Sequence, residues 1–280
     1  MISDSQTNKV FLADGLKREA VFQPLTDALK QAGVEHELLA GASNIWCRDY
    51  MPIQTENNQF VLFKHDDTYG KATPTHGYGN IFHKNYSGSY TPSEIVLDGG
   101  NVVKHKDRVI ITQKVVKDNG GNESTVRKEL EKTFNAEIFL IPTEPYDALG
   151  HADGMVRFLD EKTVLVNDYG KAEYSESFCN KFERSLTNAG LEIKYMPFFN
   201  TEDLTQDKLP SAVGYYINFL QVGTNIFLPQ FSYKGFEHFD EEAAQTIRDA
   251  FGVEPVPIPC YELAKNGGGI LNCISWTVMS

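Results

Sequence analysis

The chain has 280 residues, of which 41% are hydrophobic and 12% aromatic, so it can bury one large core or two modest ones. Its formal net charge of -12 makes nucleic acid and anionic membranes poor partners but suits a small cationic ligand. No stretch approaches the roughly 20 apolar residues of a membrane span and no secretory pattern opens the chain, so we expect a cytoplasmic protein.

In chain order, the first predicted element is a β-rich run at 9–14, KVFLAD. Helical apolar spacing then recurs in four segments, and each is followed by a short strand. The predicted helices are 17–33, 123–135, 174–190 and 239–252, and the strands after them are 35–40, 136–142, 192–198 and 253–259. Three of the four helical segments end in glycine, which is typical of helix C-termini.

Paired β-rich runs separated by turn-prone residues predict hairpins between these helix and strand pairs. The pairs are 51–54 with 59–63, 101–104 with 108–112, 155–159 with 163–168, and 215–221 with 225–231. The unit that starts with the first of these hairpins has no clear helix. Only the Gly/Tyr/His-rich segment 66–92 precedes its strand, 94–98.

The recurring unit is therefore hairpin, helix, strand, with a period of about 50 residues that is typical of propellers and solenoids. The last hairpin lacks a second strand on its C-terminal side, because the chain ends after 270–278, ILNCISWTV. The run at 9–14 can supply that strand and close a ring. We therefore predict one domain over residues 1–280 with a five-fold pseudosymmetric α/β propeller; an open α/β sheet is the competing interpretation.

Polar residues of the types that carry catalysis or binding lie where each unit's strand leads into the next hairpin. They are Asp49 in NIWCRDYMP, Asp98 in IVLDGGNVV, His151 and Asp153 in LGHADGMVRF, Asn218 in YYINFL, and Cys273 in GGGILNCISW. Equivalent positions in a ring face the same end of its axis, so we expect these side chains to meet. The three glycines before Cys273 allow a tight turn or a close approach.

The residue types in this set suggest chemistry on a guanidinium group. Paired carboxylates bind a planar cation with several donors. A thiolate such as that of Cys273 is a good nucleophile, and holding the cation within its reach lowers the barrier by orientation. His151 can protonate the leaving nitrogen and later deprotonate water.

Each of these residues also has a purely structural interpretation. Asp49 can pair with Arg48 to fix a turn, and Asp98 precedes two glycines as turn residues often do. Trp46 can belong to the core, and Asn218 can satisfy backbone groups between strands.

Cysteines are usually buried as small apolar side chains, and we keep that interpretation for Cys47, Cys179 and Cys260. With Cys273 they make four scattered cysteines, too few for a disulfide framework, and we expect them to be reduced.

At these positions the sequence resembles the agmatine deiminase-like family of guanidine-modifying enzymes, whose fold is the five-fold α/β propeller called pentein. The matching motifs, in order, are WCRDYMP, LDGGNVV, GHADGMVRF, YYINFL with LPQF, and GGGILNCISW. They span most of the chain. The ending departs from the family, since NCISW stands where agmatine deiminases usually read histidine-cysteine-isoleucine-threonine-glutamine.

The resemblance implies that Cys273 is the nucleophile, His151 the general acid and base, and Asp49 and Asp153 the clamps on the guanidinium. It also implies that no metal or organic cofactor is used.

The resemblance further implies that Trp46 walls the pocket and that Asn218 contacts the substrate. Asp98 stands where the family usually has glutamate, one methylene longer, and is included among the catalytic residues. The expected partner is a small cationic guanidino substrate such as agmatine, with arginine and peptidyl-arginine as alternatives, and a homo-oligomer is compatible with the sequence.

Two rival functions stay open at this point. A divalent-metal hydrolase would use His65, Asp66, His76, His83 and the pair His151/Asp153, although no H-E-x-x-H or similar ligand spacing is present. An amidinotransferase or a guanidine-binding module would use the same pocket without passing the group to water.

Overall fold

The structure, a computed structural model, describes residues 1–65, 76–147, 149–201, 203–205 and 208–280. Throughout these ranges, no helix combines the length and the apolar character that crossing a membrane would require.

Over the described ranges, the strands form five three-stranded sheets with one shared plan. In each sheet an antiparallel pair of strands is joined, through a helix, to a third strand that lies parallel to the outer strand of the pair. From the inner strand outward, the sheets are β3 (Ile53–Glu56), β4 (Gln59–Lys64), β5 (Ser89–Val96); β6 (Val103–His105), β7 (Arg108–Thr112), β8 (Glu137–Ile141); β9 (Val156–Phe158), β10 (Thr163–Asn167), β11 (Glu192–Met196); β12 (Leu220–Val222), β13 (Asn225–Gln230), β14 (Val256–Pro259); and β15 (Ser275–Val278), β1 (Lys9–Ala13), β2 (Glu35–Leu39).

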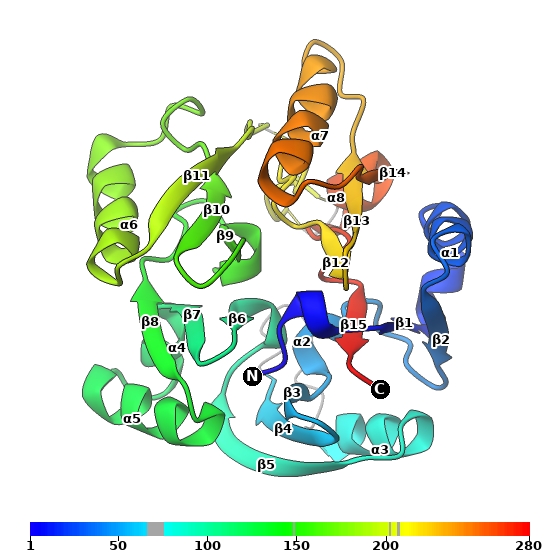
Figure 1. The fold of residues 1–280 in the computed structure, drawn as a ribbon, viewed down its shortest axis with the longest axis vertical. Helices are drawn as coiled ribbons and strands as arrows, with labels where there is room; N and C mark the ends of the chain where they lie inside the picture. Colours follow the sequence, from blue (N-terminus) through cyan, green and yellow to red (C-terminus); the bar gives the residue numbers. More distant parts are fainter. Residues whose placement is uncertain (66–75, 148, 202, 206–207) are drawn as a thin grey trace.

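The sheets are arranged around a common centre, with the long helices on the outside (Figure 1). These helices are α1 (Phe22–Gln31), α3 (His76–Asn85), α5 (Glu123–Phe134), α6 (Glu176–Asn188) and α7 (His238–Phe251). Shorter helical segments occur between them: α2 (Cys47–Tyr50), α4 (Lys114–Asp118), α8 (Tyr261–Gly267), and the 3₁₀ turns η1 (Asp4–Gln6), η2 (Asp14–Arg18), η3 (Gly99–Asn101) and η4 (Ala152–Gly154).

Helix α6 shows how the sequence produces this arrangement. Its buried residues Phe178, Phe182 and Leu186 recur every four positions, which gives one apolar face toward the sheet. The side chain of Ser175 accepts a hydrogen bond from the backbone N–H of Phe178 and caps the first turn. The helix therefore forms where local capping and burial agree.

The two ends of the chain complete one sheet, as the sequence predicts. Strand β1 pairs antiparallel with β15, with Lys9 opposite Val278 and Leu12 opposite Ser275. Strand β2 pairs parallel on the other edge of β1. Strand β15, which follows the turn that carries Cys273, is therefore paired with β1 rather than frayed.

Three sequence predictions need correction. The unit at 66–92 does contain a helix, α3, whose buried Tyr78 stacks on Tyr50 with ring centroids 4.3 Å apart. Residues 215–218, predicted as strand, instead form turns before β12. The first predicted helix, 17–33, is shorter, because η2 and a turn precede Phe22.

The apolar core lies mainly between the sheets and the outer helices. One cluster joins β1 and α1 to α7 and the β12–β13 hairpin, and a second packs α6 against β9 and β10. An aromatic cluster that includes Phe11, Phe60, Phe82 and Trp276 joins the sheet closed by the chain ends to the next one. Neighbouring units are thus packed together, which fixes the turns at the inner strands.

Candidate active site

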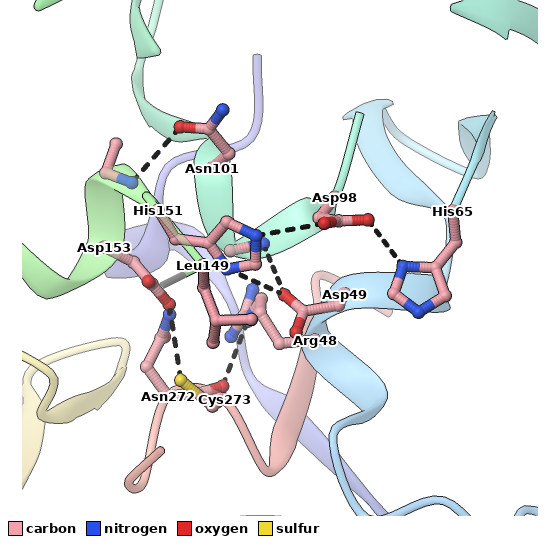
Figure 2. Close-up of polar contacts among 12 residues, drawn as sticks. Arg48, Asp49, His65, Asp98, Asn101, Leu149, His151, Asp153, Asn272 and Cys273 are labelled. Atoms are coloured by element: carbon pink, nitrogen blue, oxygen red, sulfur yellow. Dashed lines mark hydrogen bonds and ion pairs between the residues drawn. The ribbon is translucent and has the colours of Figure 1, made fainter. Parts of the chain in front are cut away.

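The predicted equivalent positions do come together. Each one precedes an inner strand: Asp49 before β3, Asp98 before β6, His151 and Asp153 before β9, Asn218 before β12, and Cys273 before β15. Figure 2 shows several of these side chains pointing toward one another from different units.

The imidazole of His151 lies between two carboxylates. Its Nε2 is 3.0 Å from Oδ2 of Asp98, and its Nδ1 is 3.6 Å from Oδ1 of Asp49. Side-chain exposure of the three groups is 9% or less. The Nδ1 atom is buried and has no hydrogen-bond partner within the described residues, so it is available to a group placed in the site.

The thiol of Cys273 lies on the other side of the site, within 3.9 Å of Oδ2 of Asp153 and 3.4 Å of Oδ1 of Asn218. The side chain of Asn272 donates to the same Asp153 oxygen at 2.6 Å. Asn218 also accepts from the backbone N–H of Asn272, through both its side-chain and its backbone oxygen. Asn218 therefore does serve backbone groups, and it also contacts the sulfur.

Arg48 holds the turn that carries Cys273 instead of pairing with Asp49. Its backbone N–H donates to the carbonyl oxygen of Cys273 at 3.1 Å, and its Nε donates to that of Asn272 at 3.2 Å. The carboxylate of Asp49 accepts from the backbone N–H of Gly100 at 3.0 Å. In the motif WCRD, Arg48 thus fixes the backbone of the Cys273 turn, whereas the neighbouring Asp49 faces the site.

The glycines of this region make close approaches possible. A Cβ on Gly267 or Gly269 would lie 2.6 Å from the ring of Trp46. Gly268 has φ +70°, a conformation that side chains rarely tolerate. Trp46 therefore packs against the glycine turn, and it is not among the described residues that line the cavity.

A cavity of about 50 Å³ opens over the thiol. His151, Asp153, Asn218 and Cys273 line it, and Asp147 adds a further carboxylate to its wall. Within the described residues, the lining contains neither lysine nor arginine. The cavity is therefore suited to a cation.

The carboxylates control the charge of the imidazole. Burial favours the neutral ring, but Asp49 and then Asp98 outweigh burial and raise the pKa of His151 to about 10. Burial raises the pKa of Asp49 to about 6, because the nearby imidazolium only partly offsets burial and the other carboxylates. At neutral pH the site thus holds a protonated imidazole beside ionised carboxylates.

The thiol is held in its neutral form. Burial, followed by the charges of Asp153 and Asp49, raises the pKa of Cys273 well above its usual range. A cation bound between the same carboxylates would cancel their effect and favour the thiolate.

The other three cysteines lie in ordinary packing environments. Cys47 is buried and donates to the carbonyl of Ile274 at 3.2 Å, and Cys260 is buried in the apolar core. Cys179 is half-buried on α6.

Those candidate metal ligands that the structure describes do not form a ligand set. In the ranges that the structure describes, no three His, Cys, Asp or Glu side chains are grouped as a metal ion requires. His83 stacks on the ring of Tyr90 at 5.1 Å, away from His65, which contacts Asp98. Asp66 and the side chain of His76 lie outside the described part of the chain.

The sequence interpretation missed three polar neighbours. Asn272 and Asp147 could have been found from their positions beside Cys273 and four residues before His151. His65 was named only as a possible metal ligand, and no sequence signal pointed to the contact with Asp98 that the structure shows.

The sequence is similar to known proteins over most of its length. The sequence model of the Porphyromonas-type peptidyl-arginine deiminase family matches residues 3–278. A Streptococcus mutans protein named "Putative agmatine deiminase" is 23% identical over 216 residues, which cover 67% of this chain and 58% of that protein.

Solved structures share the fold at low sequence identity. Agmatine deiminase from C. jejuni superposes with a TM-score of 0.79 at 15% identity, covering 100% of this chain and 95% of the other. An amidinotransferase from Microseira wollei superposes with a TM-score of 0.66 at 14% identity, covering 98% and 94%. The mixed α/β fold thus occurs in both hydrolases and transferases, and the choice between them depends on the site.

Proposed function

The chain belongs to the Porphyromonas-type peptidyl-arginine deiminase family, and from this premise we propose that it is a hydrolase that converts a guanidino group to a ureido group and ammonia. One observation carries the proposal: a thiol, an imidazole and carboxylates from turns far apart in sequence meet at one cavity that lacks lysine and arginine among its described lining residues. We further propose that the five units form a closed α/β propeller and a single domain over residues 1–280.

The substrate binds first through attraction between its positive charge and the carboxylates of the site. Asp49 and Asp153 hold the planar guanidinium through paired hydrogen bonds, and they do so in a buried site where competing water is scarce. The positive charge of the substrate offsets the two carboxylates that keep the thiol of Cys273 neutral. The thiol then releases its proton to water, so the nucleophile is formed only when the substrate is present.

The reaction proceeds in two halves. The sulfur of Cys273 attacks the guanidinium carbon, His151 gives its proton to a terminal nitrogen, and the C–N bond breaks to release ammonia. This leaves an S-alkylthiouronium on the enzyme. The now neutral His151 takes a proton from water and the oxygen adds to the same carbon. The C–S bond then breaks as the hydroxyl proton passes to the leaving sulfur, which gives the ureido product and the neutral thiol of Cys273.

The substrate is a small guanidine without a carboxylate near the reacting group. Free arginine would need a cation for its carboxylate, whereas the described cavity wall offers the carboxylate of Asp147. Agmatine and simple alkylguanidines satisfy this condition. A cytoplasmic location fits the reaction, because Cys273 must stay reduced.

A substrate screen tests the proposal. Purified protein is incubated with agmatine, arginine, a peptidyl-arginine and alkylguanidines, and ammonia and ureido product are both measured. We expect equal amounts of the two products from agmatine or an alkylguanidine, and less from arginine. Transfer of the amidino group to an added amine without urea formation would identify an amidinotransferase, and binding with neither product would identify a binding module.

The pH dependence follows from the shifted groups. We expect kcat/KM to rise as the pH increases through about 6, where Asp49 loses its proton and can hold the cation. We expect it to fall as the pH increases through about 10, where His151 loses the proton that it must donate. Rates measured across this range in one buffer series check both limbs. A rate that climbs steadily with alkaline pH would instead indicate a thiol that ionises before substrate binds.

A further inference from the structure

Asp98 is shared by two histidines. Its Oδ2 faces Nε2 of His151 at 3.0 Å, and its Oδ1 faces Nδ1 of His65 at 2.5 Å (Figure 2). The side chains of His65 and Asp98 are 10% and 8% exposed. A buried carboxylate that is held through both oxygens has little freedom to rotate, so its direction toward His151 is fixed.

The position of His65 is itself fixed by packing. It follows strand β4, and its ring meets the rings of Tyr50 and Tyr78 edge-on, with centroids 6.3 Å and 5.7 Å away. His65 is not among the described residues that line the cavity. Its direct contact with the site is through Asp98, while its charge also lowers the pKa of Asp49.

The arrangement compensates for a short carboxylate. The resemblance noted above places glutamate where this chain has Asp98, and a side chain one methylene shorter reaches less far and is guided by fewer torsions. The hydrogen bond from the imidazole of His65 to Oδ1 gives the carboxylate of Asp98 a defined orientation again. We propose that His65 is a positioning residue that orients Asp98 and moderates its charge toward His151; this inference rests on the proposed function.

The direction of the electrostatic effect can be derived. A donor on Oδ1 of Asp98 draws charge away from the oxygen that faces His151, and it does so whether His65 is neutral or protonated. Burial would raise the pKa of Asp98, but the hydrogen bonds from His151 and His65 outweigh burial and lower it, so the carboxylate stays ionised. Removing the donor should strengthen the hold of Asp98 on the His151 proton.

The other charged groups near the imidazole stay in place in such a variant. Asp49 faces His151 from α2 and Asp153 from η4, and Asp147 accepts from the backbone N–H of His151 at 3.1 Å. His65 also acts on Asp49 through its charge, so a change in the titration of His151 reports the path through Asp98 when an uncharged donor at position 65 reverses it.

The test compares His65→Leu, which removes the donor, with His65→Asn, whose amide nitrogen can occupy the place of Nδ1. For His65→Leu we expect kcat to fall about 10-fold with KM little changed, because a more tightly held proton makes a weaker acid. We also expect the alkaline limb to move upward by about one pH unit. His65→Asn should restore both quantities to near wild type, and His238→Asn, at an exposed position on α7, serves as control.

A second readout does not depend on turnover. Histidine side chains labelled for NMR give the pKa of His151 directly, and it should rise in His65→Leu but not in His65→Asn. If His65→Leu does not fold, His65→Phe keeps a flat ring beside the tyrosines without a donor.

An alkaline limb and a His151 titration unchanged in the donor-free variant would overturn the proposal. So would equal losses in His65→Leu and His65→Asn, which would indicate packing alone. If wild type releases no ammonia from any guanidine, the proposed function fails, and the NMR titration still decides whether His65 acts through Asp98.

Discussion

Replacing Cys273 with serine is expected to abolish ammonia release from every guanidine that the wild type accepts. A hydroxyl is a far weaker nucleophile than a thiolate, and loss of a nucleophile typically lowers turnover by roughly four orders of magnitude or more. The fold should be retained, because serine is smaller than cysteine and Asn218 remains as a hydrogen-bond partner. Initial rates and thermal unfolding of the same preparation measure both effects.

The matched control is Cys179→Ser. That thiol is half-buried on α6 and lies outside the residues that line the cavity in the described structure, so we expect wild-type rates. Retained turnover in Cys273→Ser would remove Cys273 from the mechanism. Equal losses in the two variants would point to a general effect of losing a thiol.

Replacing Gly100 with alanine should block the site with little effect on folding. A Cβ at this position would lie 2.6 Å from Oδ1 of Asp49, 2.8 Å from Nδ1 of His151 and 3.4 Å from Oδ1 of Asp153. The methyl group would therefore push apart the groups that bind and protonate the substrate. Displacements of about 1 Å at a reacting centre can cost 10²-fold, and we expect at least that loss in kcat/KM.

The control for this variant is Gly170→Ala, where the nearest neighbour of the added Cβ is 3.8 Å away. Gly100 does not have the positive φ that would make alanine strained, so a folded Gly100→Ala protein is expected. A folded variant with wild-type kcat/KM would show that the reacting groups do not meet where the structure places them.

The five-unit repeat could be predicted from the sequence because each unit repeats the same alternation of hairpin, helix and strand. The pairing of the two chain ends was predictable from one unpaired run at each end, and the register of Lys9 opposite Val278 confirms this pairing. These signals are strong because they depend on β-rich runs and turns that local chemistry already favours.

Helix α3 could not be predicted, because Gly77, Gly79, Asn80 and Asn85 weaken its helical pattern. Packing compensates for this weakness: the buried ring of Phe82 lies edge-on to other aromatic rings of the sheet. Tertiary contacts thus form a helix that its own sequence disfavours.

The site was largely predictable for a different reason. Equivalent positions in repeated units arranged around a centre lie near one another, so the proximity of Asp49 and Cys273 could be predicted from the sequence alone. His65 lies off that pattern, one strand away from the equivalent position of its unit, and only the folded structure shows its contact with Asp98.

The geometry also answers whether an aspartate can serve at position 98, where the family that the sequence resembles usually has glutamate. The sequence left open whether Asp98 could reach the imidazole, and the 3.0 Å separation from His151 shows that it does. The contact of Asp98 with His65 is not visible in a motif.

The mechanism requires the thiol of Cys273 to face carboxylates that hold a flat cation. The most direct measurement treats the protein with chloroacetamidine, a flat cation with an alkylating carbon, and with neutral chloroacetamide, and maps the labelled cysteines by mass spectrometry. We predict rapid labelling of Cys273 by the cation alone, prevented by an accepted guanidine and lost when Asp49 and Asp153 are both replaced by asparagine. Equal labelling by the two reagents, or labelling that persists in the double variant, would contradict the account.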